Sequence, residues 1–282
     1  MHTVYAHRGS SLAFAENTRA AFLQAVAEGA DGIECDVHLT RDLEVVCLHD
    51  DTVDRTSTGT GDVAELTLRQ LRALDVSSWK GARIPERFGA RSQQLVTLAE
   101  LVGLMLESGR DLGLAIELKH PSPFGRDLER RVLEELRGLG WDPATSRLGT
   151  LTVSLMSFDP GSIDHLSREV PVHALCQLVT GVDEDLLDEF GPVGGALATY
   201  IVRRALEGGV SQLEAGRAGL AGPGIAWVRQ NAETARRWLA AGIRLRVWTV
   251  DEDDDIDFLA DLGVSEFTSN RPAHVKERLA RR

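Results

Sequence analysis

Short apolar runs alternate with longer amphipathic stretches along most of this 282-residue chain. The short runs are rich in Val, Ile and Leu, as in buried parallel strands, and the longer stretches repeat apolar residues at helical spacing. Strands are predicted at 4–6, 32–39, 44–48, 112–118, 149–154, 172–175, 243–250 and 264–268, and 194–200 and 224–228 compete for one more. Helices are predicted from about 18 to 28, after a cap at Asn17 or Thr18, and at 98–106, 128–139, 162–167, 184–190, 232–241, 254–262 and 273–280.

This alternation gives about eight strand–helix units, the repeat of a (β/α)₈ TIM barrel, which is an α/β fold with a parallel sheet. The pattern breaks between residues 51 and about 94, where Thr, Ser, Gly and Arg predominate and only 66–74 resembles a helix. A stretch of this length with little regular structure is usually functional or inserted. We therefore expect one barrel domain over residues 1–282, with a small inserted subdomain at about 51–94, after the second strand.

Composition narrows the classes of partner. Hydrophobic residues make up 43% of the chain and charged residues 26%, which is ordinary for a soluble globular protein. The formal net charge of -12 disfavours nucleic acid or an anionic membrane as a partner. Three cysteines are too few for a disulfide framework, no apolar run is long enough to span a bilayer, and the first residues do not resemble a signal sequence. We expect a cytoplasmic protein without stable membrane association.

Residues that carry chemistry gather at the predicted strand ends. His7 and Arg8 follow the first strand, and His49 ends the extended stretch at 44–48. Glu34 and Asp36 are two apart on a strand, so their side chains share a face. In such barrels the reactive groups lie at the carboxyl ends of the strands, which places these residues near one another.

A further predicted strand, 112–118, supplies Glu117, and Lys119 follows two residues later. Glu34, Asp36 and Glu117 would offer oxygen ligands to one divalent metal ion, Mg²⁺ or Ca²⁺. Two histidines can exchange protons near neutral pH, and an arginine can bind a phosphate through two nitrogens. These residue types together indicate metal-assisted cleavage of a phosphate ester.

Each residue also has a structural alternative. A single histidine after a strand often does no more than form a hydrogen bond within the fold, and Lys119 can pair simply with Glu117. Paired acids on an inward strand face are harder to explain in this way, because an uncompensated buried carboxylate costs several kcal/mol. In the insertion, Arg55 either contacts phosphate or braces the loop, and Trp79 and Phe88 either meet an acyl chain or pack against the barrel.

An ordered set of motifs resembles the glycerophosphodiester phosphodiesterase family. The motifs run from residue 6 to about residue 272 in family order, and the set is much more specific than its first member alone. The matching runs are Ala6-His7-Arg8-Gly9, Glu16-Asn17-Thr18, Gly32-Ile33-Glu34-Cys35-Asp36-Val37, Leu48-His49-Asp50, Asp51-Thr52-Val53-Asp54-Arg55-Thr56, Ile116-Glu117-Leu118-Lys119, Ser157-Phe158 and Val247-Trp248-Thr249-Val250.

The resemblance implies a (β/α)₈ barrel with an insertion after the second strand, and it implies a phosphoric diester hydrolase. It also implies roles for individual side chains. These are acid–base catalysis by His7 and His49, metal binding by Glu34, Asp36 and Glu117, and substrate binding by Arg8, Lys119, Phe158 and Trp248.

Two positions depart from the family pattern. Asp251 follows the Trp-Thr-Val run where family members often carry Asn, and Asn270 stands where Asp is usual. Neither is a position to which the resemblance assigns metal binding or acid–base chemistry.

The expected reaction is metal-dependent hydrolysis of a small glycerophosphodiester to sn-glycerol 3-phosphate and an alcohol. One histidine would deprotonate the nucleophile and the other would protonate the leaving alkoxide. Two alternatives stay open: lysophospholipase D-type cleavage on the same barrel, and a non-catalytic barrel that binds phosphate or a polyol.

Overall fold

The structure, a computed structural model, describes residues 2–180 and 208–282. In that part of the chain a parallel barrel closes in the order β1-β2-β4-β6-β7-β8-β9-β10, and β10 pairs again with β1. The barrel strands are β1 (Thr3–Ala6), β2 (Gly32–Leu39), β4 (Leu112–Leu118), β6 (Leu151–Ser157), β7 (Leu175–Val179), β8 (Leu220–Pro223), β9 (Arg244–Val247) and β10 (Glu266–Ser269). The predicted (β/α)₈ TIM barrel is confirmed.

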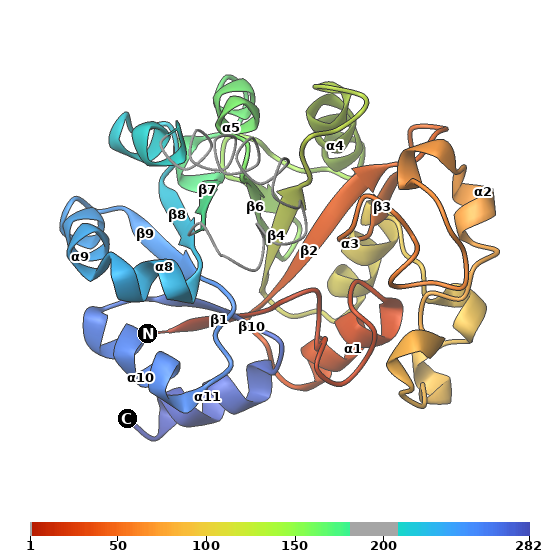
Figure 1. Ribbon diagram of the computed structural model, residues 1–282, viewed down its shortest axis with the longest axis horizontal. Helices are drawn as coiled ribbons and strands as arrows, with labels where there is room; N and C mark the ends of the chain where they lie inside the picture. Colours follow the sequence, from red (N-terminus) through yellow and green to blue (C-terminus); the bar gives the residue numbers. More distant parts are fainter. Residues whose placement is uncertain (1, 181–207) are drawn as a thin grey trace, which may run out of the picture.

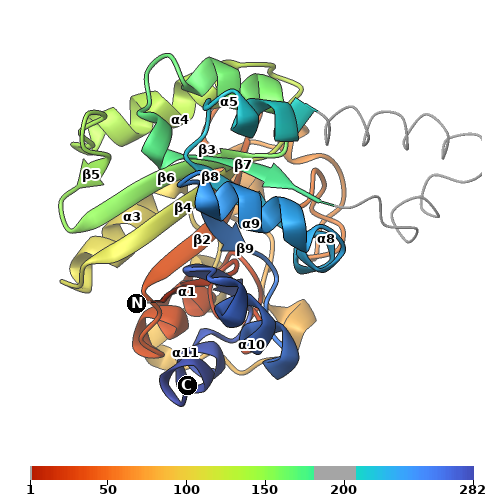
Figure 2. The same cartoon turned by 90° about the vertical axis from the view of Figure 1, so that its left-hand side faces the viewer.

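Helices surround the strands, as Figures 1 and 2 show. The largest core cluster includes Phe22, Ile33 and Leu101, each at most 1% exposed, because strand residues that point away from the barrel axis pack against the helices. None of the described helices is long and apolar enough to cross a lipid bilayer. The helices are α1 (Arg19–Ala27), α3 (Leu98–Glu107), α4 (Asp127–Gly138), α5 (Pro160–Leu166), α8 (Ile225–Gln230), α9 (Ala232–Ala240), α10 (Asp253–Leu262) and α11 (Pro272–Ala280).

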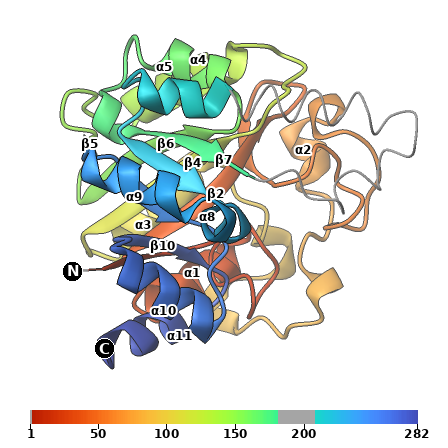
Figure 3. The same cartoon turned by 60° about the vertical axis from the view of Figure 1, so that its left-hand side comes forward.

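Residues 51–94, which we call the 51–94 segment, contain short helical turns and one four-residue helix, α2 (Leu68–Leu71). The segment follows β3 (Val45–Cys47), which pairs antiparallel with β2. Figures 1 and 3 show the segment in orange beside these two strands. It has a hydrophobic cluster of its own, which anchors it to β3: Val46, Leu48, Val53, Val63, Leu71, Val76 and Leu95.

Inside the barrel, Tyr5 lies against Gly32 and Gly113. A Cβ at either glycine would approach an atom of the Tyr5 side chain to 2.4 Å, so only glycine leaves room for this side chain. The Arg246 guanidinium lies 3.9 Å from the centre of the same ring, and its Nε donates to Glu266 at 2.8 Å. This buried layer lies beneath the carboxyl ends of the strands and supports the side chains at those ends.

Most predicted elements are present within one to three residues of their expected bounds, with two corrections. The strand predicted at 172–175 is wrong: Val172–Ala174 form a 3₁₀ turn after Pro171, and β7 begins at Leu175. The candidate strand at 224–228 is also wrong, because β8 ends at Pro223 and 225–230 form α8. The predictions for 184–190 and 194–200 lie outside the described residues. The short strand β5 (Arg147–Leu148), antiparallel to β6, was not predicted.

Candidate active site

One cavity of about 460 Å³ collects most of the side chains singled out from the sequence. Asp36 is not in its wall but lies directly behind it, 1% exposed. The lining residues that the sequence predicted are His7, Arg8, Glu34, His49, Glu117, Lys119, Phe158 and Trp248. Sequence reasoning missed His120, Met156, Leu178, Thr180, Arg246 and Thr268. Strand alternation was an available signal for Met156 and Arg246, which stand two residues before Phe158 and Trp248.

The three predicted acids come together. Asp36 on β2 and Glu117 on β4 are register partners in neighbouring parallel strands, and Glu34 lies two residues before Asp36 on the same face. One carboxylate oxygen from each lies within 4.8 Å of the others. Burial, together with repulsion from Asp36 and Glu117, raises the pKa of Glu34 well above its usual value. Burial likewise raises the pKa of Glu117.

Two cationic side chains partly neutralise this cluster. Lys119 Nζ lies 2.9 Å from Glu117 Oε1 and 3.4 Å from Asp36 Oδ1. Arg8 donates its backbone N–H to Glu34 Oε2 at 2.9 Å, and its Nε lies 3.3 Å from Asp36 Oδ2. Burial acts to raise the pKa of Asp36, but Lys119 and Arg8 hold it well below the usual range. Arg8 has a φ of 55°, a strained conformation that directs both its backbone N–H and its side chain to the acids.

The three acids suit a divalent cation. They are 1%, 1% and 8% exposed, too buried for water alone to solvate three carboxylates. Three negative side chains face two positive ones, so one negative charge is left uncompensated. Asp36 Oδ1 is buried and accepts no hydrogen bond from the described residues. An oxygen-only donor set of this kind matches Mg²⁺ or Ca²⁺.

His7 is held by a chain of hydrogen bonds from the far end of the sequence. Its Nδ1 lies 2.8 Å from Asn270 Oδ1, while Asn270 Nδ2 donates to Asp251 Oδ2 at 2.6 Å. A carboxylate only accepts, so the Asn270 amide nitrogen must face Asp251 and its oxygen must face His7. His7 Nδ1 therefore carries the proton, and Nε2 is the ring nitrogen left for chemistry. Burial and the neighbouring Arg8 lower the pKa of His7 to about 4.

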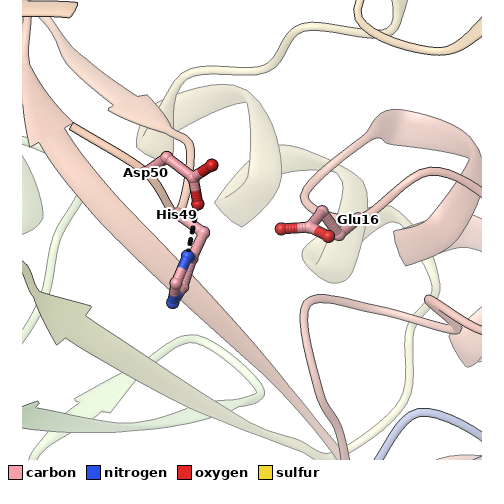
Figure 4. Close-up of side chains that lie close together, drawn as sticks. All are labelled: Glu16, His49 and Asp50. Atoms are coloured by element: carbon pink, nitrogen blue, oxygen red, sulfur yellow. Dashed lines mark hydrogen bonds and ion pairs between the residues drawn. The ribbon is translucent and has the colours of Figure 1, made fainter. Parts of the chain in front are cut away.

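His49 is held in a similar way by its neighbour in sequence. Its Nδ1 lies 2.7 Å from Asp50 Oδ1, and Figure 4 shows the other ring nitrogen pointing away from Asp50. Burial acts to raise the pKa of Asp50, but hydrogen bonds from Arg55 and His49 lower it to about 2. A charged carboxylate on Nδ1 fixes the proton there and favours protonation of the ring. Burial, with the nearby Lys119 and Arg8, outweighs this effect and lowers the pKa of His49 below its usual value.

The opposite side of the cavity is apolar. Phe158 and Trp248 meet edge to face, with ring centroids 5.5 Å apart, and Trp248 Nε1 donates to the Gly222 carbonyl at 2.8 Å. Met156 and Leu178 complete this wall. The cavity thus joins a charged side, formed from β1, β2 and β4, to an apolar side formed from β6, β7 and β9.

The structure bears on several alternatives that the sequence left open. Thr18 caps α1, whereas Asn17 donates to Asp36 Oδ2 at 2.8 Å and so supports the acid cluster. Arg55 braces its loop by binding Glu16 and Asp50. Phe88 is 5% exposed and packs edge to face on Phe14, as a core residue does. Trp79 is 39% exposed and is not among the described residues that line the cavity.

Comparisons with known proteins agree with this geometry. Residues 7–274 match the model of the glycerophosphoryl diester phosphodiesterase family. The probable glycerophosphodiester phosphodiesterase 1 of Mycobacterium tuberculosis is 34% identical over 97% of this chain and 90% of its own length. The glycerophosphodiester phosphodiesterase of Bacillus subtilis is 26% identical over 95% of this chain and 83% of its own length.

Solved structures share the fold. An Oleispira antarctica phosphodiesterase in complex with the product sn-glycerol-3-phosphate superposes with a TM-score of 0.76, at 22% identity, over 99% of this chain and 96% of the other. A glycerophosphodiester phosphodiesterase from Agrobacterium tumefaciens gives a TM-score of 0.65, at 23% identity, over 98% and 100% of the two chains. The resemblance read from the motifs is confirmed, together with the phosphoric diester hydrolase class that it implied. The chain belongs to the glycerophosphoryl diester phosphodiesterase family.

Proposed function

We propose that this enzyme hydrolyses glycerophosphodiesters to sn-glycerol 3-phosphate and an alcohol, with one bound Mg²⁺ or Ca²⁺. One observation carries the proposal: a buried cluster of three carboxylates shares a cavity with two histidines, each held through Nδ1. The product found with the Oleispira antarctica phosphodiesterase supports the choice of sn-glycerol 3-phosphate.

Glu34, Asp36 and Glu117 hold the metal ion in this proposal. The ion supplies Lewis-acid stabilisation of the charge that develops on the phosphate oxygens. A divalent cation turns the cluster's one uncompensated negative charge into one positive charge, which attracts a singly charged phosphodiester. Arg8 and Lys119 line the same side of the cavity and bind the remaining phosphate oxygens.

The two histidines differ in their partners, and this assigns their roles in the proposal. His7 faces the neutral amide of Asn270, so its unprotonated Nε2 is suited to take a proton from the nucleophile, either water or a substrate hydroxyl. His49 faces the carboxylate of Asp50, which stabilises an imidazolium. His49 is therefore the acid that protonates the leaving alkoxide.

The apolar wall selects the organic part of the substrate. Phe158 and Trp248 bury carbon–hydrogen surface opposite the charged side, which orients the ester between the two. The chain acts as one barrel domain over residues 1–282, and the 51–94 segment reaches the residues beside His49 through Arg55, which binds Asp50.

A coupled assay for sn-glycerol 3-phosphate tests the proposal on choline, ethanolamine, glycerol and inositol glycerophosphodiesters, with a lysophospholipid as control. We expect metal-dependent release of sn-glycerol 3-phosphate from at least one diester. Release of choline with lysophosphatidate, and of no sn-glycerol 3-phosphate, would instead identify a lysophospholipase D-type activity. Binding of sn-glycerol 3-phosphate with no turnover under either metal would identify a binding protein.

A further inference from the structure

A second cluster of metal-binding residue types lies beside the carboxylate cluster and contains Glu16, His49 and Asp50. One ligand atom of each lies within 4.8 Å of the others, and Figure 4 shows the Glu16 carboxylate facing Asp50 and His49. By residue type alone this resembles a second metal site. However, a positively charged side chain already binds the two carboxylates of this cluster.

That side chain is Arg55, from the 51–94 segment, which binds both carboxylates. Its Nε and Nη2 donate to the two oxygens of Asp50 at 2.7 and 2.8 Å. Its Nη1 and Nη2 donate to the two oxygens of Glu16 at 3.0 and 2.7 Å. Only a planar guanidinium offers this many donors in a fixed arrangement, and it occupies the position that a metal ion would need.

Each carboxylate that Arg55 holds leads to a different part of the reacting centre. Asp50 Oδ1 lies 2.7 Å from His49 Nδ1. Glu16 Oε1 accepts from Arg8 Nη1 at 2.9 Å, and Arg8 in turn contacts Asp36 and Glu34. A single guanidinium from the inserted segment is therefore two contacts away from a histidine and three contacts away from the carboxylate cluster.

We propose that Arg55 is a positioning residue, which holds the proton-transfer histidine and the metal-binding carboxylates in register with each other. The proposal rests on the proposed function, because the roles of His49 and the acids come from it. Arg55 is not among the described residues that line the cavity, so its effect passes through Asp50 and Glu16.

A purely stabilising role fits the geometry less well. The Arg55 side chain is 46% exposed and the Asp50 side chain 25%, so water solvates part of this network and its contribution to folding stability is modest. Without the guanidinium, two carboxylates a few ångströms apart repel each other. This repulsion would turn Asp50 away from His49. It would also displace Glu16 and, with it, the hydrogen-bonded Arg8. We therefore expect removal of the Arg55 guanidinium to disturb the positions of the reacting groups more than it lowers the folding stability.

The test compares Arg55→Gln with Arg72→Gln. Arg72 is a matched control because it lies in the same segment, is 45% exposed, and pairs with Glu100, and neither residue is among those that line the cavity. On the diester that the wild type hydrolyses best, Arg55→Gln should lower kcat by about 10- to 100-fold with KM nearly unchanged, the size expected for a residue behind a ligand. Arg55→Lys should recover part of the loss, and Arg72→Gln should match the wild type. Equal kcat values for Arg55→Gln and Arg72→Gln would overturn the proposal.

A second readout does not depend on turnover. In proton NMR, the Nδ1–H of His49 should give a slowly exchanging downfield signal, assigned by its loss in His49→Asn. The signal should disappear or move in Arg55→Gln and stay in Arg72→Gln, while circular dichroism and Tm confirm that both variants fold. An inactive wild type with this NMR result would refute the proposed function and leave the positioning contact standing. A signal unchanged in Arg55→Gln, or a second metal ion bound by the wild type at Glu16 and Asp50, would refute the role of Arg55.

Discussion

Asp251 Oδ2 accepts a hydrogen bond from Asn270 Nδ2 at 2.6 Å, and Asp251 Oδ1 also accepts from the Asn270 backbone N–H at 2.9 Å. At these two positions the family resemblance leads us to expect the reverse pair, Asn at 251 and Asp at 270. Since they touch, they are better understood as one exchanged pair than as two separate changes. As a result, a neutral amide contacts His7, and the carboxylate of Asp251 contacts that amide rather than His7 itself.

This contact predicts strong coupling between the two positions. Asn270→Asp alone sets a carboxylate against Asp251, and Asp251→Asn alone leaves two amides; each should lower both Tm and kcat/KM. The double variant restores one carboxylate and one amide, and should recover most of the loss. A thermal and kinetic double-mutant cycle should give an interaction energy of about 1–3 kcal/mol, as for residues in one hydrogen-bonded network. Simple additivity would contradict the exchanged-pair interpretation.

Replacing either histidine should remove activity and leave the fold intact. His7→Asn and His49→Asn each eliminate one proton transfer, and such transfers typically contribute about 10²- to 10⁴-fold to the rate. His165→Asn on α5 is the control, because His165 does not line the cavity. The measurements are kcat with the preferred diester, and Tm. Near-full activity in either variant would exclude acid–base catalysis by that histidine.

The crowded carboxylates should make the metal-free protein less stable than a variant with one fewer charge. Burial, together with repulsion from the neighbouring carboxylates, raises the pKa values of Glu34 and Glu117. A chelator should abolish activity, and Mg²⁺ or Ca²⁺ should restore it. Metal at about one hundred times its Kd should stabilise the wild type by about 2.7 kcal/mol. Glu34→Gln should be inactive but have a higher Tm than the metal-free wild type, with no further rise on adding metal.

Calorimetry with and without metal measures these shifts. Asp111→Asn is the control, because Asp111 has an 83% exposed side chain on the surface. A Tm that does not respond to metal in the wild type, or that responds equally in Glu34→Gln, would contradict the metal assignment.

Stability should also depend on pH through Glu129, a buried residue of α4. Its Oε1 lies 2.9 Å from His120 Nε2 and accepts from Arg126 Nη1 at 2.8 Å. Burial acts to raise the pKa of Glu129, but hydrogen bonds, that with His120 foremost, lower it to about 2. The unfolded chain takes up this proton near the ordinary value of 4.5, so the folded state gains about 3 kcal/mol from Glu129 above that pH. The gain is lost as the pH falls from about 4.5 to about 2.

Glu129→Gln should therefore lower Tm at pH 7, and its difference from the wild type should shrink steadily on acidification. Glu134→Gln, on the exposed side of the same helix, should show neither effect. Unfolding curves between pH 7 and pH 3 provide the measurement. A Tm difference that is independent of pH would show that Glu129 acts by packing alone.

Much of this protein follows from patterns that operate over a few residues. Apolar runs and helical periodicity predicted the barrel, because each strand or helix must show its own repeat to bury its own face. The pairing of Glu34 and Asp36 on one face follows from the two-residue period of a strand. Even the grouping of His7, His49 and Glu117 at one end of the barrel follows, since parallel strands end together.

Tertiary structure decided what depends on pairing between distant segments. Three contacts join residues far apart in the chain. They are the register that sets Asp36 beside Glu117, the contact of Asn270 with His7, and the hydrogen bonds from Arg55 to Glu16 and Asp50. No local periodicity encodes such contacts, because they are selected by the packing and hydrogen bonding of the whole barrel. For the same reason the start of β7 was misplaced: Val172 and Leu175 are equally apolar in sequence, and only pairing with β6 separates turn from strand.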